Sequence, residues 1–145
     1  MKLFAILALA AALTGCGGHA RRSAEDTARA WSTALNKSDN ETAADQFAPN
    51  TEIIQNGEIV LQTHRDAVQW NAGLPCGGRI IRVIHQRKNQ VLVVFRLTER
   101  PGHHCDAPGL KAAAVFRVED GRIVLWQQTA PPDEAPAPSG SGPSI

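Results

Sequence analysis

Tyrosine is absent from this chain, and neither sign of charge is in clear excess. Among the 145 residues, 15 Lys and Arg stand against 14 Asp and Glu. The missing tyrosine excludes any mechanism that needs a phenol, and the near-zero net charge lacks the basic footprint of a nucleic-acid-binding protein. With 43% apolar and 20% charged residues, the composition is that of a globular chain, and the length fits one domain. We therefore expect no nucleic-acid partner.

The sequence also lacks an apolar run long enough to cross a bilayer. The longest, Leu3 to Leu13, spans about 16 Å as a helix, against a hydrocarbon core of about 30 Å. It follows Lys2 and ends in small residues before Cys16. One positive charge, a short apolar run and a small-residue exit are the parts of a secretory signal peptide, so residues 1–15 are expected to be removed.

The last four residues of this segment, Leu-Thr-Gly-Cys ending at Cys16, resemble the lipobox of bacterial lipoproteins at every position. The resemblance implies diacylation of the Cys16 thiol, cleavage after Gly15 and acylation of the new amino terminus, with fatty acids such as palmitate. Two or three acyl chains are enough for stable anchoring, because each buried methylene contributes about 0.8 kcal/mol. We expect a lipoprotein of the bacterial cell envelope with an extracytoplasmic domain. An ordinary signal peptide with a cysteine there by chance is the alternative.

The two ends of the mature chain differ from its centre. Residues 16–22 read as a short lipid-anchored tether. Residues 130–145 hold five Pro, two Gly and three Ser and almost no bulky apolar residue, so we expect a disordered tail. The folded domain is therefore expected at residues 23–129.

Helix-start signals predict three helices in the first half of this domain. Ser23 with Asp26 begins the first, which ends near Asn36 and has on one face Ala24, Ala28, Trp31 and Leu35. Ser38 with Glu41 is predicted to cap a short second helix that carries Ala43, Ala44 and Phe47. Thr63 with Asp66 caps the third, which stops at residues 73–75. Between the last two, residues 51–61 read as two short strands around the hairpin signal Asn56-Gly57.

The second half is expected to be all strand. Residues 79–87 and 90–100 flank one turn, and residues 110–119 and 122–129 flank the Asp120-Gly121 turn. In the last hairpin, the predicted pairs are Val118 with Ile123, Phe116 with Leu125, and Val115 with Trp126. In the first, they are His85 with Leu92, Val83 with Val94, and Ile81 with Arg96; a slip by one residue would exchange the faces.

The order of these elements resembles the nuclear-transport-factor-2-like superfamily, which includes SnoaL-like and ketosteroid-isomerase-like proteins. Its more specific parts are the segment Phe47-Ala48-Pro49-Asn50 and the terminal segment from Asp120 to Trp126. The resemblance implies an α+β cone, in which three N-terminal helices pack inside a strongly curved, mostly antiparallel sheet around a conical pocket. It also implies a homodimer through the sheet face as one expected partner.

The resemblance gives little support to catalysis. The general base of ketosteroid isomerases would fall near Gln55, whose amide cannot store a proton at neutral pH, and the oxyanion-hole tyrosine has no counterpart. Asp66 is better explained as a helix cap. We therefore expect no catalytic residue and no cofactor.

Several residues are candidates for ligand binding. His85 and Arg96 share a predicted face with apolar neighbours, and would orient a ligand if that face is concave; the alternative is an outer face or partners in the backbone. Gln55 falls at the position of the family's base. Trp31, Trp70 and Trp126 are further candidates, with a place in the core as the alternative for each.

Cys76 and Cys105 remain after lipidation and flank the same end of one predicted hairpin. Because secreted proteins meet an oxidising compartment, we predict a disulfide between them. A metal site at His103-His104-Cys105-Asp106 and a cysteine nucleophile are the alternatives; no metal is expected, because adjacent residues rarely face one ion.

These observations predict a membrane-anchored lipoprotein whose cone binds a small apolar or amphipathic ligand, or a protein partner, without catalysis. One alternative is a lyase, isomerase or hydrolase acting on a small carbonyl or polyketide-like compound. A second is a structural envelope protein that associates through its sheet face.

Overall fold

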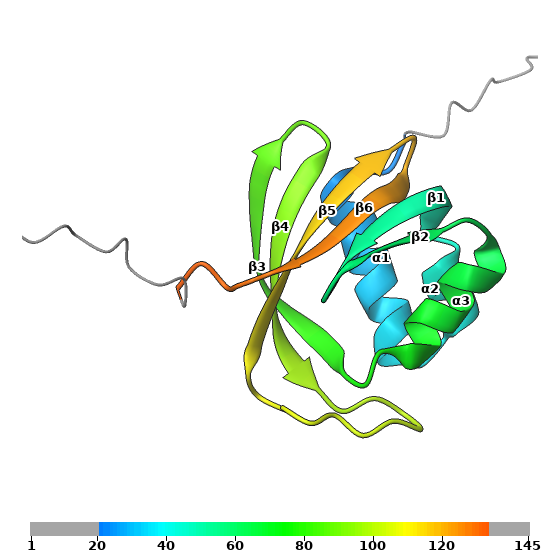
Figure 1. The fold of residues 1–145 in the computed structure, drawn as a ribbon. Coiled ribbons are helices and arrows are strands. Elements are labelled where there is room, and N and C mark those ends of the chain that lie inside the picture. The colour runs from blue at the N-terminus through cyan, green and yellow to red at the C-terminus, as the bar shows by residue number, and fades with distance from the viewer. Residues whose placement is uncertain (1–20, 134–145) are drawn as a thin grey trace, which may run out of the picture.

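The computed structural model describes residues 21–133, which form three helices and a curved six-stranded sheet (Figure 1). The predicted signal peptide, the acylation site Cys16 and residues 134–145 lie outside the described residues. The helices pack against one face of the sheet, so the α+β cone architecture expected from the sequence is confirmed. Within residues 21–133, no helix is both long and apolar enough to span a bilayer.

The helices begin at local capping signals. Helix α1 (Ala24–Asn36) starts where the Ser23 hydroxyl accepts from the Asp26 amide at 3.0 Å, as predicted. Helix α3 (His64–Gly73) starts with the predicted reciprocal capping box of Thr63 and Asp66. Helix α2 (Asn40–Ala44) is capped by Asp39 and not by Ser38, which corrects the prediction.

The six strands are β1 (Phe47–Ile54), β2 (Glu58–Leu61), β3 (Gly77–Arg87), β4 (Gln90–Thr98), β5 (Lys111–Glu119) and β6 (Arg122–Thr129). Their order in the sheet is β2-β1-β6-β5-β4-β3, and all neighbours are antiparallel except β1 and β6. The predicted second helix is too long at its end, because Phe47 already belongs to β1 and pairs with Ile123.

The last hairpin follows the predicted register only near its turn. Val118 lies opposite Ile123, as predicted, but a bulge after Arg117 shifts the rest by one residue. Trp126 therefore lies opposite Phe116, and Gln127 lies opposite Val115. A bulge inserts one residue into one strand, and every pair beyond it moves accordingly.

The predicted register of the β3–β4 hairpin holds only beside the turn, where Arg87 lies opposite Gln90, and the three predicted pairs are wrong. His85 lies opposite Val91, Val83 opposite Val93, and Arg96 opposite Arg79. Ile81 is the extra residue of a bulge between Ile80 and Arg82, and a second irregularity lies between His85 and Arg87. Because side chains alternate between the two faces, these shifts decide which residues face the helices.

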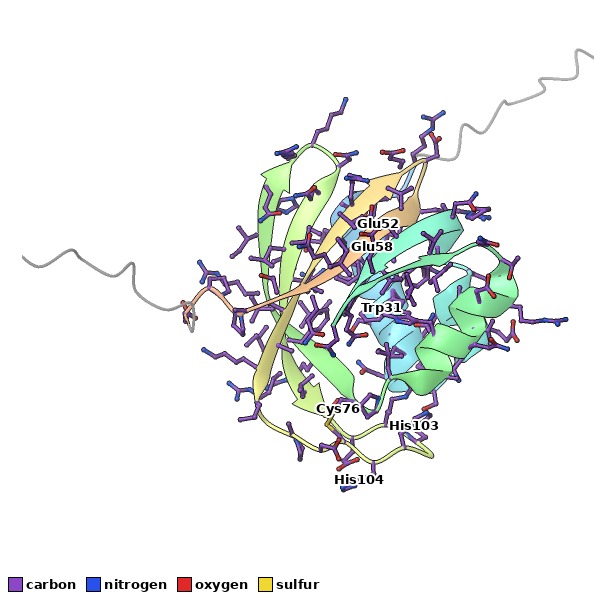
Figure 2. The ribbon with its side chains drawn as sticks, in the orientation of Figure 1. Trp31, Glu52, Glu58, Cys76, His103 and His104 are labelled. Atoms are coloured by element: carbon purple, nitrogen blue, oxygen red, sulfur yellow. A yellow bond between two sulfur atoms is a disulfide. The ribbon has the colours of Figure 1, made fainter. Side chains whose placement is uncertain are left out.

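The inner face of the sheet and α1 enclose an aromatic core. Trp31 of α1 lies 5.4 Å from Phe116, 6.1 Å from Phe95 and 6.2 Å from Trp126, measured between ring centroids. Its indole Nε1 donates to Oδ1 of the fully buried Asn71 in α3 at 2.8 Å. This bond fixes the orientation of Trp31. Figure 2 shows the position of Trp31 beside the helices.

Candidate functional site

A cavity of about 210 Å³ lies between α1 and the inner face of the sheet. It is positioned by the middle of α1, by the segment that joins α3 to β3, and by the ends of β1, β4, β5 and β6 that lie away from the β5–β6 turn. Its lining residues are Trp31, Ser32, Leu35, Gln55, Leu74, Pro75, Cys76, Gly77, Gly78, Phe95, Leu97, Ala112, Ala113, Ala114, Trp126 and Gln128.

The lining is mostly apolar. Among the residues described, it contains no titratable side chain, because its cysteine is in a disulfide. Its polar side chains are those of Ser32, Gln55 and Gln128, whereas the indole nitrogen of Trp126 is itself buried. The Ser32 hydroxyl already donates to the Gly78 carbonyl at 2.9 Å. Such a wall suits an apolar molecule that is oriented by a few neutral polar groups.

The two glutamines lie where the cavity continues outward. A wider groove of about 490 Å³ shares Gln55, Leu97, Ala112 and Gln128 with the cavity and extends past Lys111 to Pro131. Within residues 21–133, neither glutamine side-chain amide has a hydrogen-bond partner. Among the described residues, Lys111 is the only cation in either lining; it lies at the outer groove, where its Nζ is 3.5 Å from Asp133 Oδ2.

One wall of the cavity depends on a close approach of α1 to β3. The Asn36 side chain accepts from the Gly78 amide at 2.7 Å and donates to the Gly78 carbonyl at 3.0 Å. A Cβ at Gly77 would lie 2.5 Å from Asn36 Oδ1, and a Cβ at Gly78 would lie 3.0 Å from the Phe95 ring. Gly77 therefore lets α1 and β3 approach closely, and Gly78 leaves room for the Phe95 ring of β4.

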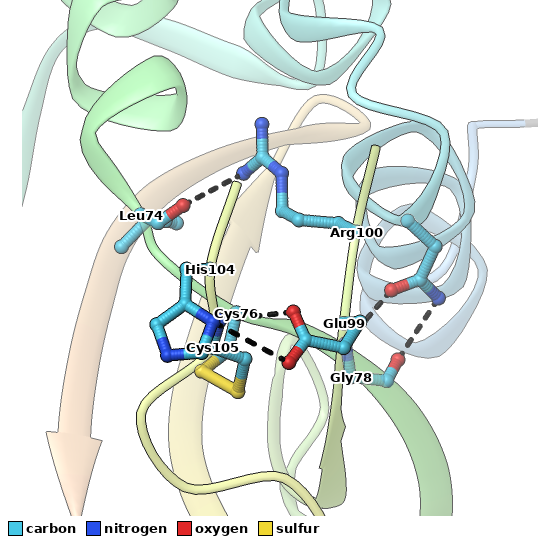
Figure 3. The surroundings of a disulfide bond; sticks show 8 residues. Leu74, Cys76, Gly78, Glu99, Arg100, His104 and Cys105 are labelled. Atoms are coloured by element: carbon cyan, nitrogen blue, oxygen red, sulfur yellow. Dashed lines mark hydrogen bonds and ion pairs between the residues drawn. A yellow bond between two sulfur atoms is a disulfide. The ribbon is translucent and has the colours of Figure 1, made fainter. Parts of the chain in front are cut away.

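The predicted disulfide between Cys76 and Cys105 is present and borders the cavity (Figure 3). The two Cα atoms lie 4.6 Å apart, and Cys105 is almost fully buried. The bond ties the β4–β5 loop to the segment that enters β3, and Cys76 itself lines the cavity. The Cys105 amide donates to Glu99 Oε2 at 3.0 Å, which holds the same loop at a second point.

Arg100 fastens this loop to the helices. Its guanidinium donates to the Asn71 and Leu74 carbonyls at 3.0 and 3.1 Å, to Asn40 Oδ1 at 2.8 Å and to the Ser38 hydroxyl at 3.1 Å. The residue is 3% exposed, and burial lowers the pKa of its guanidinium. These contacts support the end of α3 from which the cavity wall continues through Leu74.

The register correction separates the two polar residues that were expected to share a face. Arg96 lies opposite Arg79 and Lys111 on the outer face, where its guanidinium donates to the Gly109 carbonyl at 2.8 Å. His85 lies opposite the buried Val91 on the inner face, near the β3–β4 turn. Neither residue lines the cavity. The irregularity between His85 and Arg87 places His85 opposite Val91 and not opposite Leu92, and therefore on the other face from Arg96.

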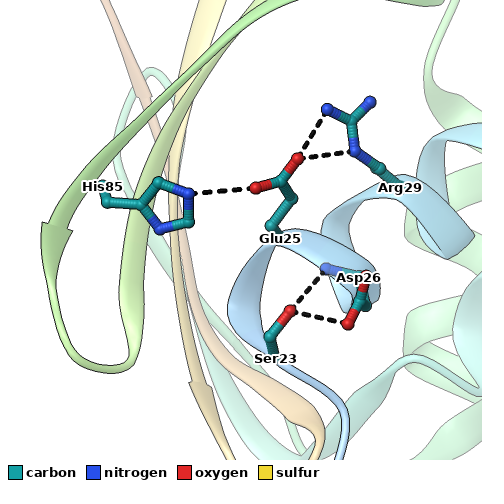
Figure 4. A network of polar contacts seen from close by, with 5 residues as sticks. All are labelled: Ser23, Glu25, Asp26, Arg29 and His85. Atoms are coloured by element: carbon teal, nitrogen blue, oxygen red, sulfur yellow. Dashed lines mark hydrogen bonds and ion pairs between the residues drawn. The ribbon is translucent and has the colours of Figure 1, made fainter.

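His85 takes part in a different contact, with the first turn of α1 (Figure 4). Its Nε2 lies 3.0 Å from Glu25 Oε2, while the other carboxylate oxygen of Glu25 accepts from the Arg29 guanidinium. The hydrogen bond from Arg29, and secondarily that with His85, lowers the pKa of Glu25. All three side chains are substantially exposed, so this network joins β3 to α1 at the surface.

The three tryptophans divide into two kinds. Trp31 and Trp126 line the cavity, whereas Trp70 does not. Trp70 lies behind them, 5.0 Å from Trp126 and 5.6 Å from Phe47 between ring centroids. Of the candidate ligand-binding residues, the structure thus brings together Gln55, Trp31 and Trp126, and leaves out Trp70, His85 and Arg96.

The histidines beside Cys105 do not converge. His103 contacts the Pro101 and Ala72 carbonyls through its two ring nitrogens, and His104 lies 3.9 Å from Glu99. No group of three His, Cys, Asp or Glu residues in the described part of the chain is placed to hold a metal ion.

Several lining residues were not anticipated from the sequence, above all Ser32, the glycine pair at 77–78 and the alanines at 112–114. The alanine run was the available signal. Alanine is depleted in strands, and consecutive short side chains in a strand leave space beside it. The contribution of Ser32 depends on its distance from β3, which no local pattern reveals.

Comparison with known proteins places this arrangement in a structural class. No family model matches the sequence, and no curated protein matches it. Among solved structures, an NTF2-like protein of unknown function from Cytophaga hutchinsonii superposes with a TM-score of 0.61 at 12% identity, covering 79% of this chain and 96% of that one.

Two further solved structures are similar. A putative polyketide cyclase from Sinorhizobium meliloti gives a TM-score of 0.58 at 17% identity, covering 72% of this chain and 94% of that one. A putative ketosteroid isomerase from Kribbella flavida gives 0.59 at 17% identity, covering 84% and 89%. At these identities the likeness shows the fold alone. The chain therefore has the NTF2-like fold, with helices packed against the inner face of a curved, six-stranded sheet.

Proposed function

We propose that this domain binds a small apolar or amphipathic molecule in the 210 Å³ cavity without transforming it. The observation that carries the proposal is the lining itself, an apolar enclosure with neutral polar groups and, among the described residues, no titratable side chain. An apolar cavity of about 150 Å³ is already large enough to hold benzene. The space here therefore suits a compound of one or two rings, or a short branched chain.

A lyase, isomerase or hydrolase acting on a small carbonyl or polyketide-like compound is the alternative, and the names of two structural neighbours, a putative polyketide cyclase and a putative ketosteroid isomerase, favour it. General acid–base catalysis needs a group that can take up and release a proton near the substrate. The position expected for that base carries Gln55, which does line the cavity but whose amide is a poor base. A cavity lining without a proton acceptor is therefore better explained by ligand binding than by catalysis.

We further propose that the domain is held at a bacterial membrane through acyl chains on Cys16, with residues 16–22 as the tether and the domain extracytoplasmic. Arg21 makes a 2.7 Å ion pair with Asp120, so the described chain begins beside the β5–β6 turn. The cavity lies at the other end of these strands: Ala112 and Glu119 are about 23 Å apart along β5 at about 3.3 Å per residue. In this arrangement the cavity opens away from the anchored end, which favours ligand capture from the aqueous phase.

We also propose that the domain forms a homodimer through the outer face of the sheet. That face carries an apolar cluster of Leu92, Val94 and Ala113 with Ile84 and Val115 packed on it. Arg79, Arg96 and Lys111 lie beside it in directly opposed positions, where like charges repel, so the apolar cluster and not these cations supports the association. Light scattering on Val115→Glu would test this association, since a shift from dimer to monomer is expected.

The test of ligand binding is native mass spectrometry of the protein purified from its own host. The proposal predicts a retained small molecule that is released by unfolding and returns unchanged after incubation with the protein. Chemical conversion of that molecule by the protein would instead establish the enzymatic alternative. Retention of nothing, together with no measurable binding of indane as an apolar probe, would contradict the binding proposal.

A further inference from the structure

The mouth of the cavity carries two glutamine side chains, Gln55 and Gln128, that come from neighbouring strands. Both residues line the cavity and also the wider groove outside it. Gln128 is the second residue after Trp126 in β6 and lies opposite Ala114 of β5, which belongs to the cavity wall. Because side chains alternate along a strand and directly opposed residues share a face, Gln128 lies on the inner face of the sheet.

Gln55 reaches the same place from the end of β1. It is the second residue after Ile53, which is only 1% exposed in the core, so it follows the same face of the sheet. The parallel register between the two strands pairs Ile54 with Gln127. Gln55 and Gln128 are the next residues on these strands, which lie about 4.8 Å apart. The two side chains are therefore neighbours at the mouth.

Both side-chain amides are available to a bound molecule. Within residues 21–133, neither amide has a hydrogen-bond partner. Gln128 is exposed, and the amide atoms of the half-buried Gln55 are accessible to solvent, in contrast to the indole nitrogen of Trp126. The third polar side chain of the wall, Ser32, already donates to the Gly78 carbonyl. The two glutamines are thus the polar side chains of the wall that remain for a ligand.

A pair of primary amides favours one kind of polar group. Each amide supplies an acceptor oxygen and a donor NH2 group, so a hydroxyl or a carboxamide can donate to one glutamine and accept from the other. An ionised carboxylate can only accept. In the described part of the chain, no cation lines the cavity, and Lys111 of the groove already lies beside Asp133. A charged group that loses its water at the mouth is therefore disfavoured.

We infer that the ligand of this cavity is an apolar molecule with a neutral head group that both donates and accepts hydrogen bonds, a hydroxyl or a carboxamide, and that Gln55 and Gln128 hold this head group at the mouth. The inference rests on the proposed binding function. The apolar body of the ligand lies farther in, beside Phe95 and Ala114 of the wall, and the head group faces the groove.

The test uses three probes with the same ring system: indane, 2-indanol, which adds a hydroxyl, and indane-2-carboxylate, which adds a charge. Affinities are measured by NMR titration on the full chain carrying Cys16→Ser, so that no lipid is attached. The variants are Gln55→Met and Gln128→Met, which keep an unbranched side chain but remove the amide. Gln62→Met is the matched control, because Gln62 is exposed and lines neither the cavity nor the groove.

Each of the two mouth variants is expected to weaken 2-indanol binding by roughly 2- to 13-fold relative to its effect on indane, the range for one neutral hydrogen bond. Gln62→Met should leave the ratio of the two affinities unchanged. In the parent protein, 2-indanol should bind more tightly than the carboxylate. It should also move the side-chain NH2 resonances of Gln55 and Gln128 farther downfield than indane does, a measurement that needs no variant.

Three results would overturn the inference or its foundation, and they are distinguishable. If indane and 2-indanol bind but the mouth variants leave their affinity ratio unchanged, the cavity binds apolar molecules and the role of the glutamines is wrong. If the carboxylate binds more tightly than 2-indanol, the head group is not neutral. If none of the three probes binds, the proposed binding function itself is wrong.

Discussion

Removal of the Cys76–Cys105 disulfide should lower the free energy of unfolding, and the size of the loss depends on the length of chain between the two cysteines. The cysteines are separated by 29 residues, and closing a loop of that size restricts the unfolded chain by about 3–4 kcal/mol. For a folded unit of this size, near 110 residues, the entropy of unfolding is about 0.23 kcal/mol/K, so the expected fall in Tm is about 13–17 °C.

The assay is thermal unfolding followed by circular dichroism, on the parent protein and on the double variant Cys76→Ala/Cys105→Ala, so that no free thiol remains. Reductant should lower the Tm of the parent to nearly that of the double variant and leave the double variant unchanged. Because Cys76 lines the cavity, the loss should also weaken probe binding. A fall in Tm below about 4 °C, or two free thiols in the folded secreted protein, would refute this reasoning.

Four further predictions follow from single residues. Arg100→Met should lower the free energy of unfolding in urea by about 2–4 kcal/mol, because it leaves buried carbonyl acceptors without a donor; a loss below about 1 kcal/mol would contradict the role given to this arginine. Gly78→Ala should lower the free energy of unfolding by about 1–3 kcal/mol, because the added methyl crowds the Phe95 ring, and should reduce the affinity for indane. If neither quantity changes, the cavity wall accommodates the methyl and this reasoning is wrong. In the folded state, the pKa of Glu25 lies below its ordinary value of 4.5. The contribution of Glu25 to the free energy of unfolding is therefore complete above pH 4.5 and is lost as the pH falls through the folded pKa. Glu25→Gln should therefore be less stable than the parent at neutral pH and equal to it near pH 2, whereas a constant difference would exclude this linkage. Cys16→Ser should abolish labelling by an alkyne fatty acid and release the protein from the membrane fraction, and an unlabelled, soluble parent protein would contradict lipid anchoring.

The elements of this fold that could be predicted from the sequence are those with local signals. The capping box at Thr63 and Asp66 determines where α3 begins, and the Asp120-Gly121 turn fixes the neighbouring pair of the last hairpin. Both depend on residues within a few positions of each other, where the backbone geometry admits few choices.

The faces of the strands could not be predicted in the same way. The bulge at Ile81 and the shift after Arg117 depend on packing against other strands and α1, and each moves all later pairs. The irregularity between His85 and Arg87 acts in the same way, and because of it His85 and Arg96 were assigned to one face although they lie on opposite faces. The prediction that Ser38 caps α2 was wrong for a local reason. Ser38 has a φ of 56°, and its hydroxyl donates to the Pro101 carbonyl instead.

The candidate site was predictable in part. Trp31 and Trp126 were identifiable as large aromatics on amphipathic elements, and Gln55 by its place in the resemblance to ketosteroid isomerases. The rest of the wall arises from contacts between distant segments, such as the bonds of Asn36 with Gly78, which lie 42 positions apart. Sequence patterns report periodicity along one element and not the distance between two.

The central claim, that the cavity binds a small apolar molecule, is tested most directly by titrating indane against a variant that fills the space. Ala112→Leu adds three carbon atoms to a cavity-lining residue at the start of β5. Ala72→Leu makes the same change on the exposed surface of α3, outside the cavity. The account predicts saturable binding to the parent protein and to Ala72→Leu, and a loss of roughly 5- to 150-fold in Ala112→Leu. Equal affinity in all three proteins, or no binding to the parent, would contradict it.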